Sequence, residues 1–282
     1  MNRTDTISPQ PVTFYGHGGL RLAGDEWGRD TGYKIVLLLH GGGQTRHSWK
    51  ETGERLAARG FRVVALDARG HGESEWADAG GYSLELFAAD VVAVVKQLGE
   101  PVSIVGASLG GLTGILAAHQ LDEAVRKLIL VDIVPKMEMQ GGVRIREFMR
   151  RHLDGFSHLE DAADAISEYL PHRKRPTNLD GLRRNLRLRD DGRWYWHWDP
   201  KFIDDPAEHL TELAERLESI AANLGIPILV VRGGLSDVVS RRSVHSFLDA
   251  VPSAQFVELD SAAHTAPGDD NDAFTSVVVE FV

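Results

Sequence analysis

Short, continuous apolar runs alternate along the chain with longer segments in which apolar residues recur at helical spacing. The runs are rich in Val, Ile and Leu, and each is long enough for a strand but too short for a typical helix. Unbroken apolar runs are typical of strands that are buried on both faces of a parallel sheet. The pattern therefore predicts strands at 34–40, 61–67, 101–107, 126–132, 227–233 and 254–260.

The segments between these runs predict amphipathic helices. Residues 84–98 place their apolar side chains on one helix face behind Ser83, a favourable N-cap residue, and the pattern returns behind Ser240 and at 274–281. Strands that alternate with helices indicate a parallel sheet with helices on both faces. The opening segments, 11–17 and 20–28, predict a hairpin that adds an antiparallel edge. We expect an α/β fold with a mostly parallel sheet of eight strands, which are the six runs and the two hairpin strands.

One long stretch interrupts the alternation. Residues 135–225 contain helical patches, many arginines and the segment GRWYWHWDP, but no buried-strand run. This stretch follows the sixth strand, so it is interpreted as an insertion. The sequence predicts a core domain at 1–134 and 226–282 and a mainly helical cap at 135–225. The basic part of the insertion, from Arg173 to Arg193, is interpreted as a solvated helix face.

Composition excludes several classes of function. The 282 residues are 43% hydrophobic, which suits one large domain or a domain with an insertion, and the net charge of −10 disfavours nucleic acid as a partner. The chain has no cysteine, and no H-x-H or H-E-x-x-H spacing occurs, so we expect no disulfide, no metal site and no cofactor. No apolar run approaches the roughly 20 residues that span a bilayer, and the polar N-terminus lacks a secretory signal. We therefore expect a cytoplasmic protein without a membrane partner.

A serine between glycines follows the predicted strand at 101–107. In Gly106-Ala107-Ser108-Leu109-Gly110 the serine falls on a strand-to-helix turn, and flanking glycines avoid clashes when such a turn is sharp. The hydroxyl would stand at a helix N-terminus, where free N–H groups favour developing negative charge. The pattern predicts that Ser108 is a nucleophile.

The partners that a serine nucleophile needs follow other strands. His264 lies in a loop after the last predicted strand, and Asp237 lies just beyond the strand at 227–233. Asp132, which closes the strand at 126–132, is the alternative acid. The glycine-rich loop from His40 to Trp49 can turn backbone N–H groups toward a carbonyl oxygen, because glycines place no β-carbon in the way.

Together these motifs resemble the α/β-hydrolase fold of the cap-bearing type, and the resemblance covers essentially the whole chain. The segment DARGHGES at 67–74 is similar to the family's D-x-R-G-x-G-x-S loop. The resemblance implies that Ser108 is the nucleophile, His264 the general base and Asp237 the acid. It also implies an oxyanion hole formed by the N–H groups of Gly42 and Leu109, and loop-orienting roles for His40 and His71.

Two departures from relatives narrow the chemistry. Enzymes of this fold that open epoxides or displace halide use an aspartate at the position of Ser108, so the resemblance disfavours both reactions. Lipases of the hormone-sensitive type also carry an H-G-G-G loop, but their extra acid after the elbow and their N-terminal cap have no evident counterpart in this sequence.

The cap is expected to supply most of the substrate pocket. Trp194, Trp196 and Trp198 alternate, so in an extended segment they face one side and either contact an apolar substrate group or anchor the cap. Candidate pocket residues are His40, Gly41, Met137, Trp194 and Trp196. We expect a small-molecule substrate with an apolar or aromatic part, and the sequence leaves a homodimer open. The histidine at position 197 is given no role.

The reaction expected from the resemblance is hydrolysis of a carboxylic ester, thioester or lactone through an acyl-enzyme. Two alternatives stay open. Relatives with the same triad cleave a carbon–carbon bond in vinylogous diketones, and hormone receptors of this fold keep the triad with slow turnover.

Overall fold

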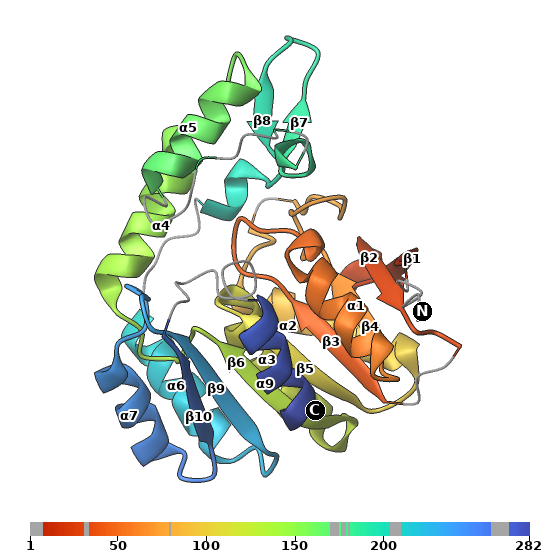
Figure 1. Cartoon of the computed structure of the whole chain (residues 1–282), viewed down its shortest axis with the longest axis vertical. Helices are drawn as coiled ribbons and strands as arrows, with labels where there is room; N and C mark the ends of the chain where they lie inside the picture. Colours follow the sequence, from red (N-terminus) through yellow and green to blue (C-terminus); the bar gives the residue numbers. More distant parts are fainter. Residues whose placement is uncertain are drawn as a thin grey trace, which may run out of the picture.

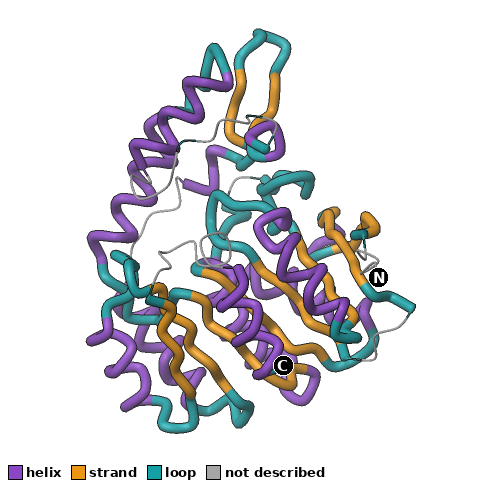
Figure 2. The backbone as a smooth tube through the Cα atoms, viewed as in Figure 1, coloured by secondary structure: helices purple, strands orange, loops and turns teal. Residues whose placement is uncertain are grey.

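Eight strands form one sheet that lies between two layers of helices (Figures 1 and 2). The computed structural model describes residues 8–30, 34–78, 80–169, 175, 179, 181–203, 210–260 and 271–282. The strand order is β1-β2-β4-β3-β5-β6-β9-β10, and every pair from β4 to β10 is parallel. The strands are β1 Gln10–Tyr15, β2 Arg21–Trp27, β3 Ile35–Leu39, β4 Arg62–Leu66, β5 Val102–Ala107, β6 Val125–Val131, β9 Ile228–Gly233 and β10 Gln255–Leu259. The predicted fold class is confirmed.

The hairpin at the start of the chain supplies the antiparallel edge. Strand β1 pairs with β2, and β2 pairs antiparallel with β4. The turn between β1 and β2 contains Gly18 and Gly19, whose φ angles of 72° and 81° favour glycine. The predicted hairpin is therefore confirmed.

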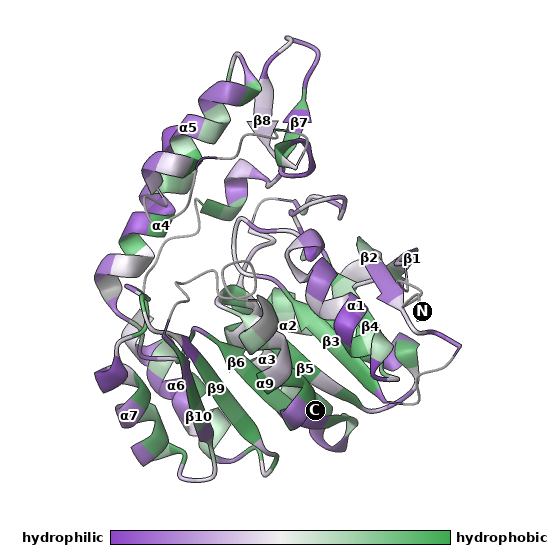
Figure 3. Ribbon diagram, viewed as in Figure 1, coloured by the Kyte–Doolittle hydropathy of each residue, from purple (hydrophilic) through white to green (hydrophobic). Residues whose placement is uncertain are grey.

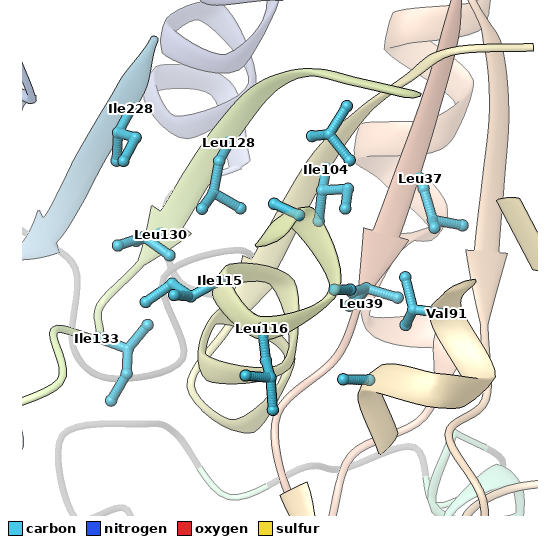
Figure 4. Packing of buried hydrophobic residues seen from close by; sticks show 14 of the residues in the cluster. Leu37, Leu39, Val91, Ile104, Ile115, Leu116, Leu128, Leu130, Ile133 and Ile228 are labelled. Carbon is cyan, nitrogen blue, oxygen red and sulfur yellow. The ribbon is translucent and has the colours of Figure 1, made fainter. Parts of the chain in front are cut away.

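Alternate residues of the central strands enter two separate apolar clusters, because successive side chains in a strand point to opposite faces. Leu37 and Leu39 of β3 join the larger cluster with α2 (Leu84–Leu98) and α3 (Leu109–Leu121). Val36 and Leu38 pack on the other face with α1 (Lys50–Ala58) and α9 (Asn271–Phe281). The central strands β3, β6 and β9 are hydrophobic along their length (Figure 3). Figure 4 shows Ile115 of α3 among side chains of the neighbouring strands. Burial on both faces explains why these strands are continuous apolar runs.

The helices of the core begin and end close to the predicted positions. Ser83 caps α2 by accepting a hydrogen bond from the Leu86 N–H, and Ser240 caps α7 by accepting one from the Ser243 N–H. Among the described residues, no helix is long and apolar enough to cross a membrane. The helices are α1 Lys50–Ala58, α2 Leu84–Leu98, α3 Leu109–Leu121, α7 Arg241–Ala250 and α9 Asn271–Phe281, with α4 Met139–Arg151, α5 Leu159–Tyr169 and α6 Leu210–Ala222 in the insertion.

The insertion between β6 and β9 builds a cap with a small core of its own. Its elements are α4, α5, a short 3-10 turn at Pro200–Ile203 and a two-stranded hairpin of β7 Leu186–Leu188 and β8 Trp194–Trp196. Apolar side chains of α4, α5 and the hairpin form one cluster, which includes Met149, Ala162 and Trp196. In Figure 1 the cap rises above the sheet as an arm of two helices with the hairpin beside it.

The last helix of the insertion belongs to the core by its packing. Leu217 and Ala221 of α6 are buried in the larger core cluster, and α6 lies against α3 and α7. The predicted cap segment of 135–225 therefore does not end at a packing boundary, because its final helix covers the sheet. The periodicity of α6 indicates an amphipathic helix but does not reveal which domain its apolar face contacts.

Candidate active site

Ser108 occupies a sharp turn between β5 and α3. Its φ and ψ angles are 47° and −114°, a combination that L-residues rarely adopt. The Ser108 N–H donates to the Val131 carbonyl of the adjacent strand β6, while the Ser108 carbonyl accepts from Gly111 and Leu112 in α3. Backbone strain of this kind persists only where the surroundings impose it, and it gathers at functional sites. The structure thus places Ser108 where the sequence predicts a strand-turn-helix.

Two glycines make this turn possible because backbone passes very close to them. A methyl group on Gly106 would lie 2.3 Å from the carbonyl oxygen of Gly110. One on Gly110 would lie 2.4 Å from the carbonyl oxygen of Leu39 and 2.8 Å from that of His40. These neighbours are backbone atoms, which cannot move aside as the end of a side chain can. Helix α3 therefore approaches β3 and β5 only because these positions lack a Cβ.

A Gly110→Ala substitution should lower the free energy of unfolding by about 2–4 kcal/mol, since the added methyl forces α3 away from β3. Urea denaturation at neutral pH measures the change. The matched control is Gly181→Ala in the cap, where an added methyl meets no atom within 4 Å. Equal stability of the Gly110 variant and the wild type would contradict the close packing.

The glycine-rich loop after β3 lies directly against this turn. A methyl group on Gly41 would lie 3.3 Å from the Cβ of Ser108, and one on Gly42 would lie 4.0 Å from Cδ2 of Leu109. The structure therefore brings together four residues that the sequence assigns to the site: Gly41, Gly42, Ser108 and Leu109. Leu109 is the first residue of α3, and the first N–H groups of a helix have no partner within it.

Hydrogen bonds to one carbonyl orient the peptide that carries the Gly42 N–H. The Gly41 carbonyl accepts from His40 Nδ1 at 2.8 Å and from the Gln44 N–H at 3.1 Å. In a trans peptide the carbonyl and the following N–H point in opposite directions. The Gly42 N–H is thereby aimed away from the His40 ring. This bond agrees with the orienting role that the resemblance implies for His40, and His40 also lines a cavity together with Leu109 and Gly110.

The loop at 67–74 contacts the glycine-rich loop and stabilises it. Asp67 accepts hydrogen bonds from the backbone N–H groups of Arg46 and Glu73 and forms a buried ion pair with the Arg46 guanidinium. His40 Nε2 accepts from the Ala68 N–H at 3.0 Å. The two loops are therefore joined by several bonds that involve backbone groups.

Three buried imidazoles line up where these loops meet the cap. The ring centroids of His40 and His71 are 5.2 Å apart, and those of His71 and His197 are 5.8 Å apart. Burial lowers the pKa of all three, and in His71 burial and the neighbouring His40 ring lower it to about 3. The three rings are therefore neutral near pH 7, with one nitrogen that donates and one that accepts.

These neutral rings should make the protein sensitive to acid. An unfolded imidazole has a pKa near 6.5, so below this pH the unfolded state binds more protons than the folded state. The free energy of unfolding should fall as the pH drops from 7 to 5.5, with up to about 1.4 kcal/mol per pH unit lost for each buried ring. Urea denaturation across this range measures the slope. The slope is proportional to the number of protons that the chain takes up on unfolding, and a His71→Gln variant should lower this number by about one. An unchanged slope would contradict the assignment of His71 as a buried neutral ring.

The two candidate acids lie in different surroundings. Asp237, which the sequence analysis favours, is exposed, and its carboxylate forms an ion pair at 3.0 Å with Arg144 of α4. Asp132 is fully buried at the end of β6, next to the strand that carries Ser108. Its carboxylate accepts from the Gly233 N–H at 2.8 Å and from the Ser236 hydroxyl at 2.5 Å. His264 lies outside the described residues.

Comparisons with known proteins place the chain in a family. A family model described as serine aminopeptidase, S33 matches residues 32–271. The chain belongs to this family. Among solved structures, an α/β hydrolase from Novosphingobium aromaticivorans superposes on this S33 chain with a TM-score of 0.80 and 25% identity. That superposition covers 98% of the chain and 99% of the other protein.

Two curated relatives of this S33 chain are named as an esterase and as an oligomer hydrolase. It is 31% identical over 215 residues to esterase Rv0045c of Mycobacterium tuberculosis, which covers 73% of the chain and 67% of the relative. It is 28% identical over 257 residues to a 3-hydroxybutyrate-oligomer hydrolase of Cupriavidus necator, which covers 86% of the chain and 87% of the relative. The S33 chain is therefore an enzyme, a carboxylic ester hydrolase of the α/β-hydrolase fold.

Three residues predicted to line the pocket pack in apolar clusters of this S33 hydrolase. Trp196 is buried in the cap cluster, where it stacks on Trp198 with 4.9 Å between ring centroids, and Trp194 is half-buried in the same cluster. Met137 packs against the larger core cluster. The three tryptophans thus pack in one cluster of the cap, on one side of the segment as their alternation predicts.

Other cap side chains of the S33 hydrolase cover the glycine-rich loop. A methyl group on Gly42 would lie 3.4 Å from Phe202, and one on Gly43 would lie 3.2 Å from Met149 and 3.5 Å from Trp198. Sequence reasoning did not assign Phe202 or Met149 to the site, because nothing local to them indicates a loop about 100 residues or more away. In the described part of the chain, no group of three or more His, Asp or Glu residues could hold a metal ion.

Proposed function

We propose that the enzyme cleaves a carboxylic ester, thioester or lactone through an acyl-enzyme formed on Ser108. The observation that carries this proposal is the strained backbone of Ser108, held against Gly41 on one side and followed by the first turn of α3 on the other. We propose that this geometry turns the Ser108 hydroxyl toward two backbone N–H groups, those of Gly42 and Leu109. Donors fixed in advance at such a place stabilise the oxyanion of a tetrahedral intermediate.

The proposed steps use residues of this chain alone. His264 removes the hydroxyl proton as Ser108 attacks the carbonyl carbon, and the new oxyanion accepts from the Gly42 and Leu109 N–H groups. The intermediate collapses as His264 gives the proton to the leaving oxygen or sulfur. Water activated by the same histidine then hydrolyses the acyl-enzyme and regenerates the Ser108 hydroxyl.

For the acid that orients His264, burial favours Asp132 over Asp237. A triad acid holds the imidazole tautomer and stabilises the imidazolium, and both effects are stronger in a water-excluded site. Asp132 is fully buried and held in place by the loop after β9, whereas the carboxylate of Asp237 is 44% exposed and paired with Arg144. We propose Asp132 as the acid, with Asp237 as the alternative.

The substrate side of the proposal rests on the cap residues above the glycine loop. Phe202, Met149 and Trp198 are apolar and lie against Gly42 and Gly43. A group next to the scissile carbonyl would meet these side chains, so we propose that the substrate is a small molecule with an apolar or aromatic part at that place.

A substrate panel tests the reaction class. The panel holds p-nitrophenyl esters of rising acyl length, a charged succinyl ester, a thioester, a lactone, a vinylogous diketone and an amino-acid p-nitroanilide. We expect steady turnover of the apolar esters, weak activity on the succinyl ester, and labelling of the Ser108 peptide by a fluorophosphonate. Cleavage of the diketone alone would support carbon–carbon hydrolysis, and turnover of the anilide alone would support an aminopeptidase. A single burst with retained product would support a receptor.

A further inference from the structure

The segment Gly41–Gly43 of the glycine-rich loop, here called the oxyanion loop, consists of glycines only, so its geometry must be imposed by its surroundings. Gly41, Gly42 and Gly43 follow one another, and Gly43 has a φ of 75°. Glycine populates such conformations readily but restricts the chain less than any other residue. A donor contributes to catalysis in proportion to how well it is fixed before the reaction.

Each of the three peptide groups in this loop is held by a different histidine. His40 donates to the Gly41 carbonyl and so holds the peptide between Gly41 and Gly42. His71 Nε2 accepts from the Gly43 N–H at 3.1 Å and holds the next peptide. The third peptide is held through the Gly43 carbonyl, which accepts from His197 Nε2 at 3.2 Å.

The third histidine differs from the other two because it comes from the cap. His197 follows β8 and is 1% exposed, and its Nδ1 accepts from the Gly72 N–H of the 67–74 loop at 2.8 Å. A backbone N–H can only donate, so Nδ1 is unprotonated, and the proton of the neutral ring lies on Nε2, which donates to Gly43. One ring therefore joins the cap, the 67–74 loop and the oxyanion loop.

We propose that His197 is a positioning residue for the oxyanion hole, which makes the full rate depend on a docked cap. His40 and His71 belong to the core and hold two peptide groups of the oxyanion loop. His197 belongs to the cap, so it holds the third peptide group only when the base of the cap is docked on this loop. This inference rests on the proposed function, because it concerns the Gly42 donor of the same site. The neutral state of the buried ring, whose pKa is lowered by burial and by His71, agrees with its role as an acceptor from Gly72.

The cap has other anchors that do not touch the oxyanion loop, and they provide a control. The Tyr82 hydroxyl donates to Asp199 at 2.6 Å, and the Asp199 N–H donates to the Gly70 carbonyl at 2.8 Å. A Tyr82→Phe substitution removes the hydrogen bond between the core and Asp199 of the cap and leaves all three histidine bonds to the oxyanion loop in place. Loss of rate in His197 variants beyond that of Tyr82→Phe would therefore arise in the loop.

Substitution of His197 by Gln or by Asn distinguishes the effects of its two hydrogen bonds, one to Gly43 and one to Gly72. The amide of Gln reaches the place of Nε2 and can donate to Gly43, whereas the shorter Asn reaches the place of Nδ1 and can accept only from Gly72. The experiment measures kcat and KM on the best p-nitrophenyl ester for wild type, His197→Ala, His197→Gln, His197→Asn and Tyr82→Phe. Thermal denaturation confirms that each variant is folded at the assay temperature.

We expect kcat of His197→Ala and His197→Asn to fall about 10–100-fold with KM changed less than about 3-fold, because a displaced donor acts on the transition state. His197→Gln should recover kcat to within about 5-fold of wild type, and Tyr82→Phe should stay within about 3-fold. Equal rates for the Gln and Asn variants, or a change in KM alone, would overturn the positioning role. If His197→Ala is unfolded, the comparison of kcat between His197→Gln and His197→Asn still tests the positioning role. Absence of wild-type turnover would instead overturn the proposed function.

Discussion

A Ser108→Ala variant should lose about 10⁵–10⁶-fold in kcat on the best ester, while its fold is retained. The alanine cannot form an acyl-enzyme, and removing the serine or the histidine of a triad costs nearly as much as removing all three members. A His264→Ala variant should show a similar loss, because the hydroxyl then lacks a base. Steady-state rates with high enzyme concentration measure both losses, and burst experiments show whether any acyl-enzyme forms.

A second serine on the same strand serves as the control for this result. Ser103 lies on β5, buried, five residues before Ser108, and Ser103→Ala should keep kcat within about 2-fold of wild type because its hydroxyl is remote from the elbow. Since φ at Ser108 is positive, the alanine variant also carries backbone strain, so circular dichroism and thermal denaturation must accompany the rates. Activity above about 1% of wild type in folded Ser108→Ala would contradict a serine nucleophile.

The paired variants Asp132→Asn and Asp237→Asn should separate the two candidate acids. We expect Asp132→Asn to lower kcat about 10³–10⁴-fold, since an amide beside the imidazole favours the wrong tautomer. Asp237→Asn should lower kcat less than about 10-fold, because an exposed carboxylate paired with Arg144 interacts with its surroundings through water. The measurement is kcat on one ester for both variants and wild type.

Asparagine is the right replacement at position 132 because it preserves the local structure. Its Oδ1 can still accept from the Gly233 N–H, and asparagine tolerates the positive φ of 47° found there. An Arg144→Gln variant serves as a control at the other carboxylate, since it removes the partner of Asp237 and leaves both acids intact. If Asp237→Asn shows the large loss and Asp132→Asn the small one, the acid is Asp237.

Local steric requirements made the sharp turn at Ser108 predictable from the sequence. A methyl group on Gly106 or Gly110 would lie 2.3 or 2.4 Å from a backbone atom, so both positions require glycine. Both glycines lie within the five residues 106–110, so a short sequence motif reveals this requirement. The same holds for the buried strands, whose two packed faces demand continuous apolar runs, and for the N-caps Ser83 and Ser240.

Features that depend on distant partners could not be read in this way. His197 bonds to Gly72, which is 125 residues earlier, and nothing around either residue indicates the other. The choice between Asp132 and Asp237 depends on burial, which the two loops do not display in their sequences. Likewise, the alternation of Trp196 and Trp198 predicts that their rings share a face, but it does not predict that this face lies in the interior of the cap.

The positive φ at Ser108 also restricts which residues this turn can accept. Threonine carries a comparable hydroxyl, but a β-branched residue is a severe outlier at a φ of 47°, so the fold and not the chemistry excludes it. Cysteine is unbranched at Cβ and fits the same backbone. The neighbouring strand ends in the same way, since Asp132 also has a φ of 47°, and aspartate is one of the few residues that tolerate it. The positive φ angles at the ends of these two adjacent strands thus limit which residue types can occupy the site, independently of any substrate.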